Sequence, residues 1–174
     1  TERVYTDFLT ALSSGSIDWS AAGNGTWSRS AEQFKRGGYA GKLVQADTGA
    51  GMLVTKAQPD ISNFYQEWEM YDDLDPSAFK VVRVKGGDLR VGMGVYTGGP
   101  SGSLDHYTYH DKNYTYTATS VLRTQGWHTF GIRLQSNSTA VFFIDGQQVG
   151  SLAGQFASAA EVSLDGYDSV NPST

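Results

Sequence analysis

The sequence predicts an all-β domain, a two-sheet antiparallel β-sandwich, and three observations lead to this prediction. Apolar and polar residues alternate along nearly every segment, which is the period of a strand with one buried face. Turn residues interrupt the alternation at a spacing of roughly eight to twelve positions, which is typical of sandwiches. The composition agrees, because 21 of 174 residues are Gly, 13% are aromatic and 18% are charged, a mixture that favours strands and tight turns over long helices.

Twelve segments have the pattern of strands. They span residues 3–9, 26–30, 39–46, 51–56, 64–71, 78–84, 89–96, 106–118, 127–135, 139–144, 147–153 and 160–164. Turns are expected where Gly, Asn, Asp and Ser gather, at 85–88, 97–103, 136–138 and 145–146. Because each strand has to bury one face, two antiparallel sheets packed face to face are expected. The length suits a single domain over residues 1–174, which would bury roughly 70% of the surface that its unfolded chain exposes.

Charge and composition exclude several classes of function. The net charge is -5 and no cluster of Lys and Arg offsets it, so the chain would repel a phosphate backbone and no nucleic-acid partner is expected. Without Cys there is neither a disulfide nor a thiolate metal site. No apolar run approaches the roughly 18 residues of a membrane-spanning helix, so no membrane partner is expected. The start, "TERVYTDF", has no signal-peptide pattern and no Met, and we expect a processed protein or an excised module.

The strand expected at 64–71 has two carboxylates on one face. Trp68 and Met70 favour the core for the face that they share with Phe64 and Gln66. The outward positions are then Tyr65, Glu67, Glu69 and Tyr71. Glu67 and Glu69 would lie about 7 Å apart along the strand, between the separations typical of retaining and inverting glycosidases. Three interpretations stay open for them: solvated surface groups, acceptors for sugar hydroxyl groups, or a catalytic pair.

The strand expected at 89–96 has a core face and an unusual outer face. The core side chains are Leu89, Val91, Met93 and Val95. The outer positions are Arg90, Gly92, Gly94 and Tyr96. Glycines weaken a strand, so two of them on an outer face indicate either a close approach to the backbone or relief of twist.

The segment at 106–118 is the richest in aromatic residues. Alternation places Tyr107 and Tyr109 on one face. The other face holds His106, His110, Tyr114 and Tyr116. We interpret Tyr107 and Tyr109 as outward, where a row of rings could stack on sugar, the alternative being aromatic pairs that stabilise the sheet. No nucleophile motif is present, and none of the three histidines has a triad-like sequence context.

Residues 123–152 resemble a known family. Their "GWHTF" strand entry, a polar turn and "FFIDGQQVG" are similar to the concanavalin A-like, laminin-G-type jelly roll found in secreted polysaccharide-degrading enzymes and lectin-like surface proteins. The earlier "SGSIDWSAAGNGTWSRS" and "GGYAGKLV" are similar to the opening of such modules. The resemblance implies an extracellular protein, secreted or at the cell surface, that binds carbohydrate. It also implies a structural calcium ion, for which the matching positions are Asp7 and Asp168.

The predicted function is that of a noncatalytic carbohydrate-binding module for a polysaccharide or glycan, tethered to a catalytic or surface protein. Its predicted binding residues are Tyr65, Glu67, Glu69, Tyr71, Arg90, Tyr96, Tyr107 and Tyr109. One alternative is a glycoside hydrolase or polysaccharide lyase, since the fold's glycosidase signature Glu-x-Asp-x-x-Glu is partly matched by Glu67-x-Glu69-x-x-Asp72. A second alternative is an adhesion module that binds protein.

Overall fold

The structure is a computed structural model that describes most of the central part of the chain. Its described residues are 19–23, 25–31, 40–45, 50–55, 64–76, 78–86, 89–98, 102–155 and 161–168. Side chains are described at 31, 65, 67–76, 79–84, 90–98 and 102–155. The strand predicted at 3–9 lies outside the described residues.

The described residues form thirteen strands. They are β1 (Trp19–Gly23), β2 (Gly25–Ser30), β3 (Ala40–Gln45), β4 (Ala50–Thr55), β5 (Phe64–Asp72), β6 (Ala78–Gly86), β7 (Leu89–Tyr96), β8 (His106–His110), β9 (Tyr116–Leu122), β10 (Gly126–Leu134), β11 (Ala140–Ile144), β12 (Gln147–Leu152) and β13 (Glu161–Asp168). No helix in this part of the chain is long and apolar enough to cross a membrane.

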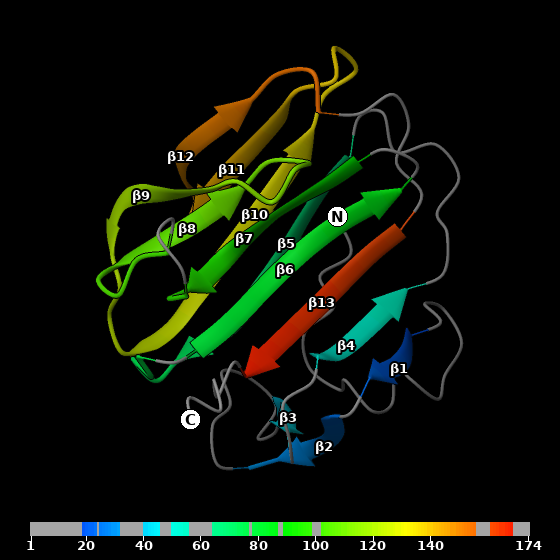
Figure 1. Cartoon of the computed structure of the whole chain (residues 1–174), viewed down its shortest axis with the longest axis vertical. Coiled ribbons are helices and arrows are strands. Elements are labelled where there is room, and N and C mark those ends of the chain that lie inside the picture. The colour runs from blue at the N-terminus through cyan, green and yellow to red at the C-terminus, as the bar shows by residue number, and fades with distance from the viewer. Residues whose placement is uncertain are drawn as a thin grey trace, which may run out of the picture.

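The strands build a two-sheet sandwich with a small additional ribbon. One sheet has seven strands in the order β1-β4-β13-β6-β7-β8-β9, the other has four in the order β12-β11-β10-β5, and β2 pairs with β3. Figure 1 shows the seven-stranded sheet in front of the four-stranded one. Every described ladder is antiparallel. The predicted all-β, two-sheet antiparallel architecture is therefore confirmed.

The core lies between the two sheets and follows the predicted alternation. On β7 Val91, Met93 and Val95 are buried, and each belongs to the core cluster. On β5 Trp68 is only 6% exposed and sits opposite Phe130 of β10. The predicted orientation of β5 is confirmed, because Trp68 points inward and Tyr65, Glu67, Glu69 and Tyr71 occupy the outward positions.

The segment predicted as one strand at 106–118 is a hairpin of two strands. A loop over 111–115 separates β8 from β9, and the Asp111 carboxylate holds it by accepting the backbone N–H of Asn113 at 2.9 Å and of Thr115 at 2.8 Å. In β9, two extra residues form a bulge, since His106 pairs with Leu122 and Thr108 with Ala118. The sequence alternates straight through the turn, and for that reason the period alone did not reveal it.

Candidate functional site

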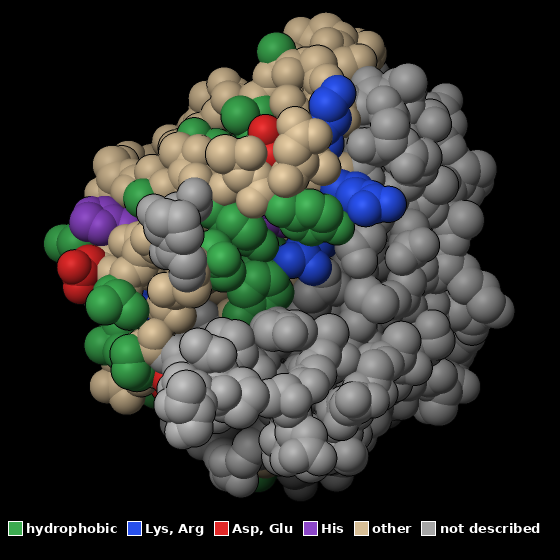
Figure 2. All heavy atoms as spheres, viewed as in Figure 1, with side chains coloured by type: hydrophobic (Ala, Val, Ile, Leu, Met, Phe, Trp, Pro, Cys, Tyr) green, Lys and Arg blue, Asp and Glu red, His purple; other side chains and the backbone are tan. Residues whose placement is uncertain are grey.

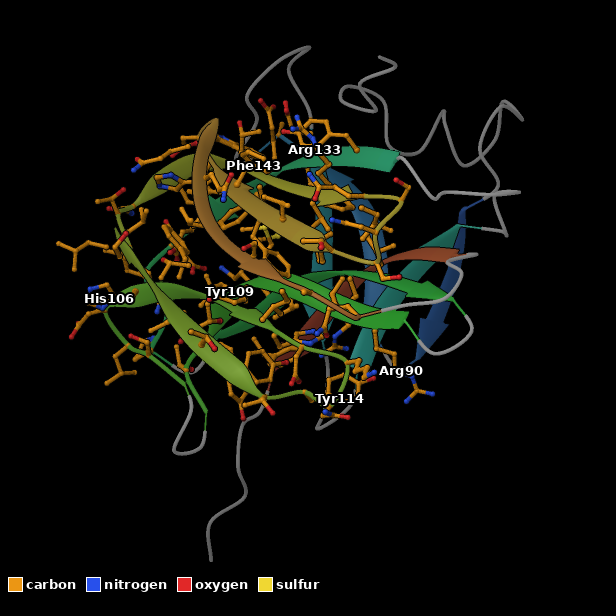
Figure 3. All side chains as sticks on the ribbon, turned by 90° about the horizontal axis from the view of Figure 1, so that it is seen from above. Arg90, His106, Tyr109, Tyr114, Arg133 and Phe143 are labelled. Carbon is orange, nitrogen blue, oxygen red and sulfur yellow. The ribbon has the colours of Figure 1, made fainter. Side chains whose placement is uncertain are left out.

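The predicted binding residues lie in three different layers of the sandwich. Tyr65, Glu67, Glu69 and Tyr71 are on the outer face of the four-stranded sheet, whereas Arg90 and Tyr96 are on the outer face of the seven-stranded sheet. Figure 3 shows the two outer faces at opposite sides, with Arg133 and Phe143 on one, Arg90 and Tyr114 on the other, and Tyr109 between the sheets. The eight residues therefore cannot form one binding surface.

The predicted outward orientation of Tyr107 and Tyr109 is wrong. Tyr107 is fully buried in the core, and Tyr109 packs against the core with its ring stacked on Phe142 at 4.7 Å. A tyrosine can face inward when its hydroxyl group finds a partner, and the Tyr107 hydroxyl donates to the carbonyl oxygen of Thr124 at 3.3 Å. The ring of Tyr107 is thus unavailable for stacking on a ligand.

The outer face of the four-stranded sheet carries aromatic rings at both ends. At one end the Arg133 guanidinium lies over Tyr65 at 5.3 Å and over Phe143 at 5.1 Å. The Tyr65 hydroxyl donates to Glu67 at 2.9 Å. At the other end Tyr71 packs edge-on against Trp127 at 5.7 Å. On this face, then, Glu67 lies beside the Tyr65 hydroxyl, and a ligand role for it stays a prediction.

The outer face of the seven-stranded sheet carries a denser group of side chains, which we call the arginine–tyrosine cluster. It consists of Phe79, Arg83, Tyr96, His110, Tyr114 and Tyr116. Tyr96 and Tyr116 are stacked with their ring centres 3.9 Å apart, and Phe79 meets Tyr96 edge-on at 5.4 Å. Figure 2 views this face and shows hydrophobic side chains gathered over β6 and β7 beside a cationic one.

Arg83 is at the centre of the cluster. Its guanidinium lies between two rings, 5.1 Å from the centre of Phe79 and 5.2 Å from that of Tyr114, which is the range of cation–π contacts. Its Nη2 donates to the Tyr116 hydroxyl and its Nε to His110 Nε2, both at 3.2 Å. One cation thus links four aromatic side chains from β6, the hairpin and β9.

The hydrogen bonds of His110 decide where its ring carries the proton. Arginine donates and cannot accept, so His110 Nε2 accepts from Arg83 and is unprotonated in this arrangement. The proton is on Nδ1, which lies 2.8 Å from the carbonyl oxygen of Asp111 and donates to it. His110 is fully buried, and its ring therefore positions Arg83.

Gly92 makes room for this pair. A Cβ at Gly92 would lie 2.5 Å from His110 Nε2, 2.7 Å from the carbonyl oxygen of Val82 and 2.8 Å from Arg83 Cγ. The predicted close approach to the backbone at this glycine is confirmed, and what approaches is the protein's own His110 and Arg83. Gly94 is required for a different reason, because its φ of 147° is one that L side chains rarely adopt.

Tyr114 covers the pair from the solvent side. It is the fourth residue of the 111–115 loop and has a φ of 61°, a left-handed conformation that is a genuine outlier for a bulky residue. Its N–H donates to the carbonyl oxygen of Asp111 at 3.0 Å. The ring lies 5.2 Å from that of His110 and remains 39% exposed. The loop thus holds a strained, exposed tyrosine over Arg83.

Four members of the cluster were identified from the sequence. His110, Tyr114 and Tyr116 were placed on one face, and Tyr96 was predicted as an outer residue. Arg83 was missed, although Val82 and Val84 are buried and the alternation of β6 places Phe79 and Arg83 on the other face. That alternation was the available signal. For the segment at 106–118, the sequence thus grouped the right residues on one face but assigned the wrong face to the solvent.

The acidic turn after β5 has a structural role. The buried Asp72 carboxylate accepts from Arg123 Nε at 2.9 Å and Nη2 at 2.8 Å. Burial raises the pKa of Asp72, but the Arg123 hydrogen bonds, the Leu74 N–H and the nearby cations outweigh it, so the pKa lies below its usual value. Asp73 pairs with Lys80. Both carboxylates therefore already have cationic partners within the chain.

The predicted calcium site falls largely outside the described part of the chain. Asp7 is not among the described residues, and of Asp168 only the backbone position at the end of β13 is described. Among the side chains that are described, no three His, Asp or Glu residues gather as a metal site. A structural calcium ion stays a prediction.

His128 has a more triad-like setting than its sequence context indicates. Its Nδ1 lies 2.8 Å from an Asp145 carboxylate oxygen, and its Nε2 lies 3.0 Å from the Thr124 hydroxyl. The carbonyl oxygen of Thr124 is also 3.0 Å from Nε2 and can only accept. The hydroxyl and carbonyl oxygens of Thr124 thus share one ring nitrogen of His128, and the ring joins Thr124, which precedes β10, to Asp145, which follows β11.

Comparisons with known proteins show the fold. No protein-family model and no curated protein sequence matches the chain. A carbohydrate esterase from the Shiga toxin-encoding bacteriophage phi24B is similar in structure, with a TM-score of 0.55, 12% identity and coverage of 95% of this chain and 97% of that one. The Emp47p carbohydrate recognition domain has a TM-score of 0.51 and 10% identity, covering 87% and 80%. A Bacillus licheniformis β-glucanase has a TM-score of 0.50 and 10% identity, and the match covers 88% of this chain and 80% of that one. The predicted concanavalin A-like jelly roll is confirmed.

Proposed function

We propose that this concanavalin A-like sandwich is a noncatalytic carbohydrate-binding module, secreted or at the cell surface, whose ligand lies on the outer face of the seven-stranded sheet. The observation that carries the proposal is the arginine–tyrosine cluster, in which the exposed Tyr114 ring is held over Arg83. An aromatic ring of this kind suits the C–H face of a sugar, while hydroxyl and guanidinium groups beside it suit sugar hydroxyl groups.

The similar structures agree with this class of ligand. Their names are those of a carbohydrate esterase, a carbohydrate recognition domain and a β-glucanase. At 10 to 12% identity they support the fold, and the ligand class for this chain is our proposal.

A glycan array followed by measured affinities for the polymers that bind would test the proposal. We expect weak binding per site, which Tyr114→Ala reduces at least tenfold through loss of the exposed ring. Tyr71→Ala is the matched control, because it removes a tyrosine from the opposite outer face and should leave binding unchanged. A blank array for the wild-type chain, or equal losses in both variants, would contradict the proposal. Variants of the buried Tyr107 would not serve, since loss of binding could then reflect unfolding.

A second candidate is a polysaccharide-cleaving enzyme that uses the same surface. It is favoured by the contact of the Tyr116 hydroxyl with Arg83 and of Arg83 with His110, because a cation beside a phenol stabilises the phenolate that a general base requires. Incubation with polysaccharides, followed by assays for reducing ends and for unsaturated uronate, distinguishes the two. Product formation that Tyr116→Phe abolishes would establish the enzyme, and binding without product would establish the module.

A further inference from the structure

Two basic residues occupy directly opposite backbone positions at one end of the seven-stranded sheet. Across the strands, Glu161 of β13 is the partner of Lys85 on β6, and Lys85 is the partner of Arg90 on β7. Gly92 pairs with His110 on β8. Lys112 follows His110 by two residues but lies in the loop over 111–115, where its N–H donates to the side-chain oxygen of Gln155 at 3.0 Å.

The whole chain has a net charge of -5, so an anionic ligand would be repelled by the chain as a whole and needs a local cation to bind. In the loop between β8 and β9, one carboxylate oxygen of Asp111 already accepts the backbone N–H groups of Asn113 and Thr115. Lys112 is exposed, and its ammonium group donates to the carbonyl oxygen of Gly154 at 3.3 Å.

At this end of the sheet the side chain of Arg90 points into solvent. It is exposed, and Figure 3 shows it on the same outer face as Tyr114. A guanidinium group binds carboxylate and sulfate oxygens with two parallel hydrogen bonds. The exposed ring of Tyr114, presented by its left-handed backbone, supplies an apolar surface on the same face.

We propose that the ligand is an acidic polysaccharide, whose carboxylate or sulfate group pairs with Arg90 and whose sugar ring packs on Tyr114. This inference rests on the proposed carbohydrate-binding function and specifies its ligand class. Uronate and sulfate share the chemistry that Arg90 recognises, so both sources belong in the test.

The test compares the wild-type chain, Arg90→Gln and Arg133→Gln in affinity electrophoresis and calorimetry. Arg133→Gln is the matched control, since it removes an exposed arginine from the opposite outer face. The ligands are a polyuronate, a sulfated polysaccharide, a neutral glucan and duplex DNA, each at low and raised salt. Thermal unfolding of each variant verifies that it is folded.

We expect the wild-type chain to bind at least one acidic polysaccharide about tenfold or more tightly than the neutral glucan, with affinity falling as salt rises. Arg90→Gln should lose about tenfold in affinity for the acidic polymer, the size of one charge-assisted hydrogen-bonded pair, and Arg133→Gln should lose none. Which acidic polymer binds identifies the anion.

Each other outcome has a definite meaning. Binding of the neutral glucan alone would overturn the acidic ligand and leave the carbohydrate-binding function intact. Equal effects of Arg90→Gln and Arg133→Gln would overturn the role of Arg90. Binding of DNA as tight as that of the acidic polymers would show unspecific attraction of polyanions and overturn the inference. Failure to bind any polysaccharide would overturn the carbohydrate-binding function itself, and the inference with it.

Discussion

Replacing Arg123 with Met is expected to destabilise the protein strongly, because it leaves a buried carboxylate without its counter-charge. The side chains of Arg123 and Asp72 are each 2% exposed, and two hydrogen bonds of 2.8 and 2.9 Å join them. Arg123 also donates to the carbonyl oxygens of Leu104 at 3.1 Å and Asp75 at 3.2 Å. It thus fastens the end of β5 to the loop before β8. Removing one partner of such a pair costs about 3 to 5 kcal/mol.

The free energy of unfolding can be measured by urea denaturation at neutral pH, with tryptophan fluorescence as the signal. Trp68 is buried in the core and reports on it. We expect Arg123→Met to lower this free energy by about 3 to 5 kcal/mol, and the double variant with Asp72→Asn to lose less, since no buried charge then remains. A loss below about 1 kcal/mol for Arg123→Met, or a double variant as unstable as the sum of the singles, would refute the reasoning.

The same pair predicts a dependence on acid. The pKa of Asp72 is lowered in the folded protein, so the folded state binds this proton more weakly than the unfolded state does. The stabilisation is therefore present above the ordinary value of 3.8 and is lost as the pH falls through the folded pKa. The gap in stability between the wild-type chain and Arg123→Met should narrow over this range, because a protonated Asp72 needs no counter-charge.

Three further predictions concern single residues. Burial raises the pKa of Tyr107 from 10.0 to about 12, so the neutral form stabilises the fold fully below pH 10, and this stabilisation is lost as the pH rises to about 12. Over this range the free energy of unfolding should fall by about 2 to 3 kcal/mol, and this fall should be absent in Tyr107→Phe. Gly92→Ala should cost about 1 to 3 kcal/mol in thermal or urea unfolding, because its Cβ would collide with the Val82 carbonyl and His110; unchanged stability would show that the strand can shift. Asp111→Ala should cost about 0.5 to 1.5 kcal/mol, since two solvent-exposed backbone N–H groups lose their acceptor to water. The amide exchange of Asn113 and Thr115 should accelerate while that of β10 does not.

The alternation in the sequence predicted core faces well where one side of a strand was plainly apolar. Val91, Met93 and Val95 of β7, and Trp68 of β5, are buried as predicted. It failed at β8 because this strand is buried on both sides. Tyr107 lies in the core, and His110 is fully buried beneath Arg83 on the other face. Since Tyr and His both combine a ring with a polar atom, neither residue type decides which side faces the core.

The candidate site was predicted only in fragments. Tyr96 and Arg90 were identified on an outer face, and His110, Tyr114 and Tyr116 were grouped. His110, Tyr114 and Tyr116 are joined by Arg83, whose guanidinium reaches β8, β9 and the loop between them, and Tyr96 joins the cluster by stacking on Tyr116. Such contacts arise from strand order within the sheet, and a periodic pattern carries no information about strand order.

The alternation in the sequence was enough to predict the fold class, most of the strand positions and the buried face of β5 and β7, because successive side chains of a strand point to opposite sides whatever its neighbours are. β1 (Trp19–Gly23) matches none of the predicted segments, and the sheet that each strand joins depends on tertiary packing. β5 pairs with β10 and not with β6, which follows it directly in the chain. That long-range pairing puts Tyr65 and Tyr96 on opposite outer faces, since sheet membership is set by packing between distant segments and not by local backbone geometry.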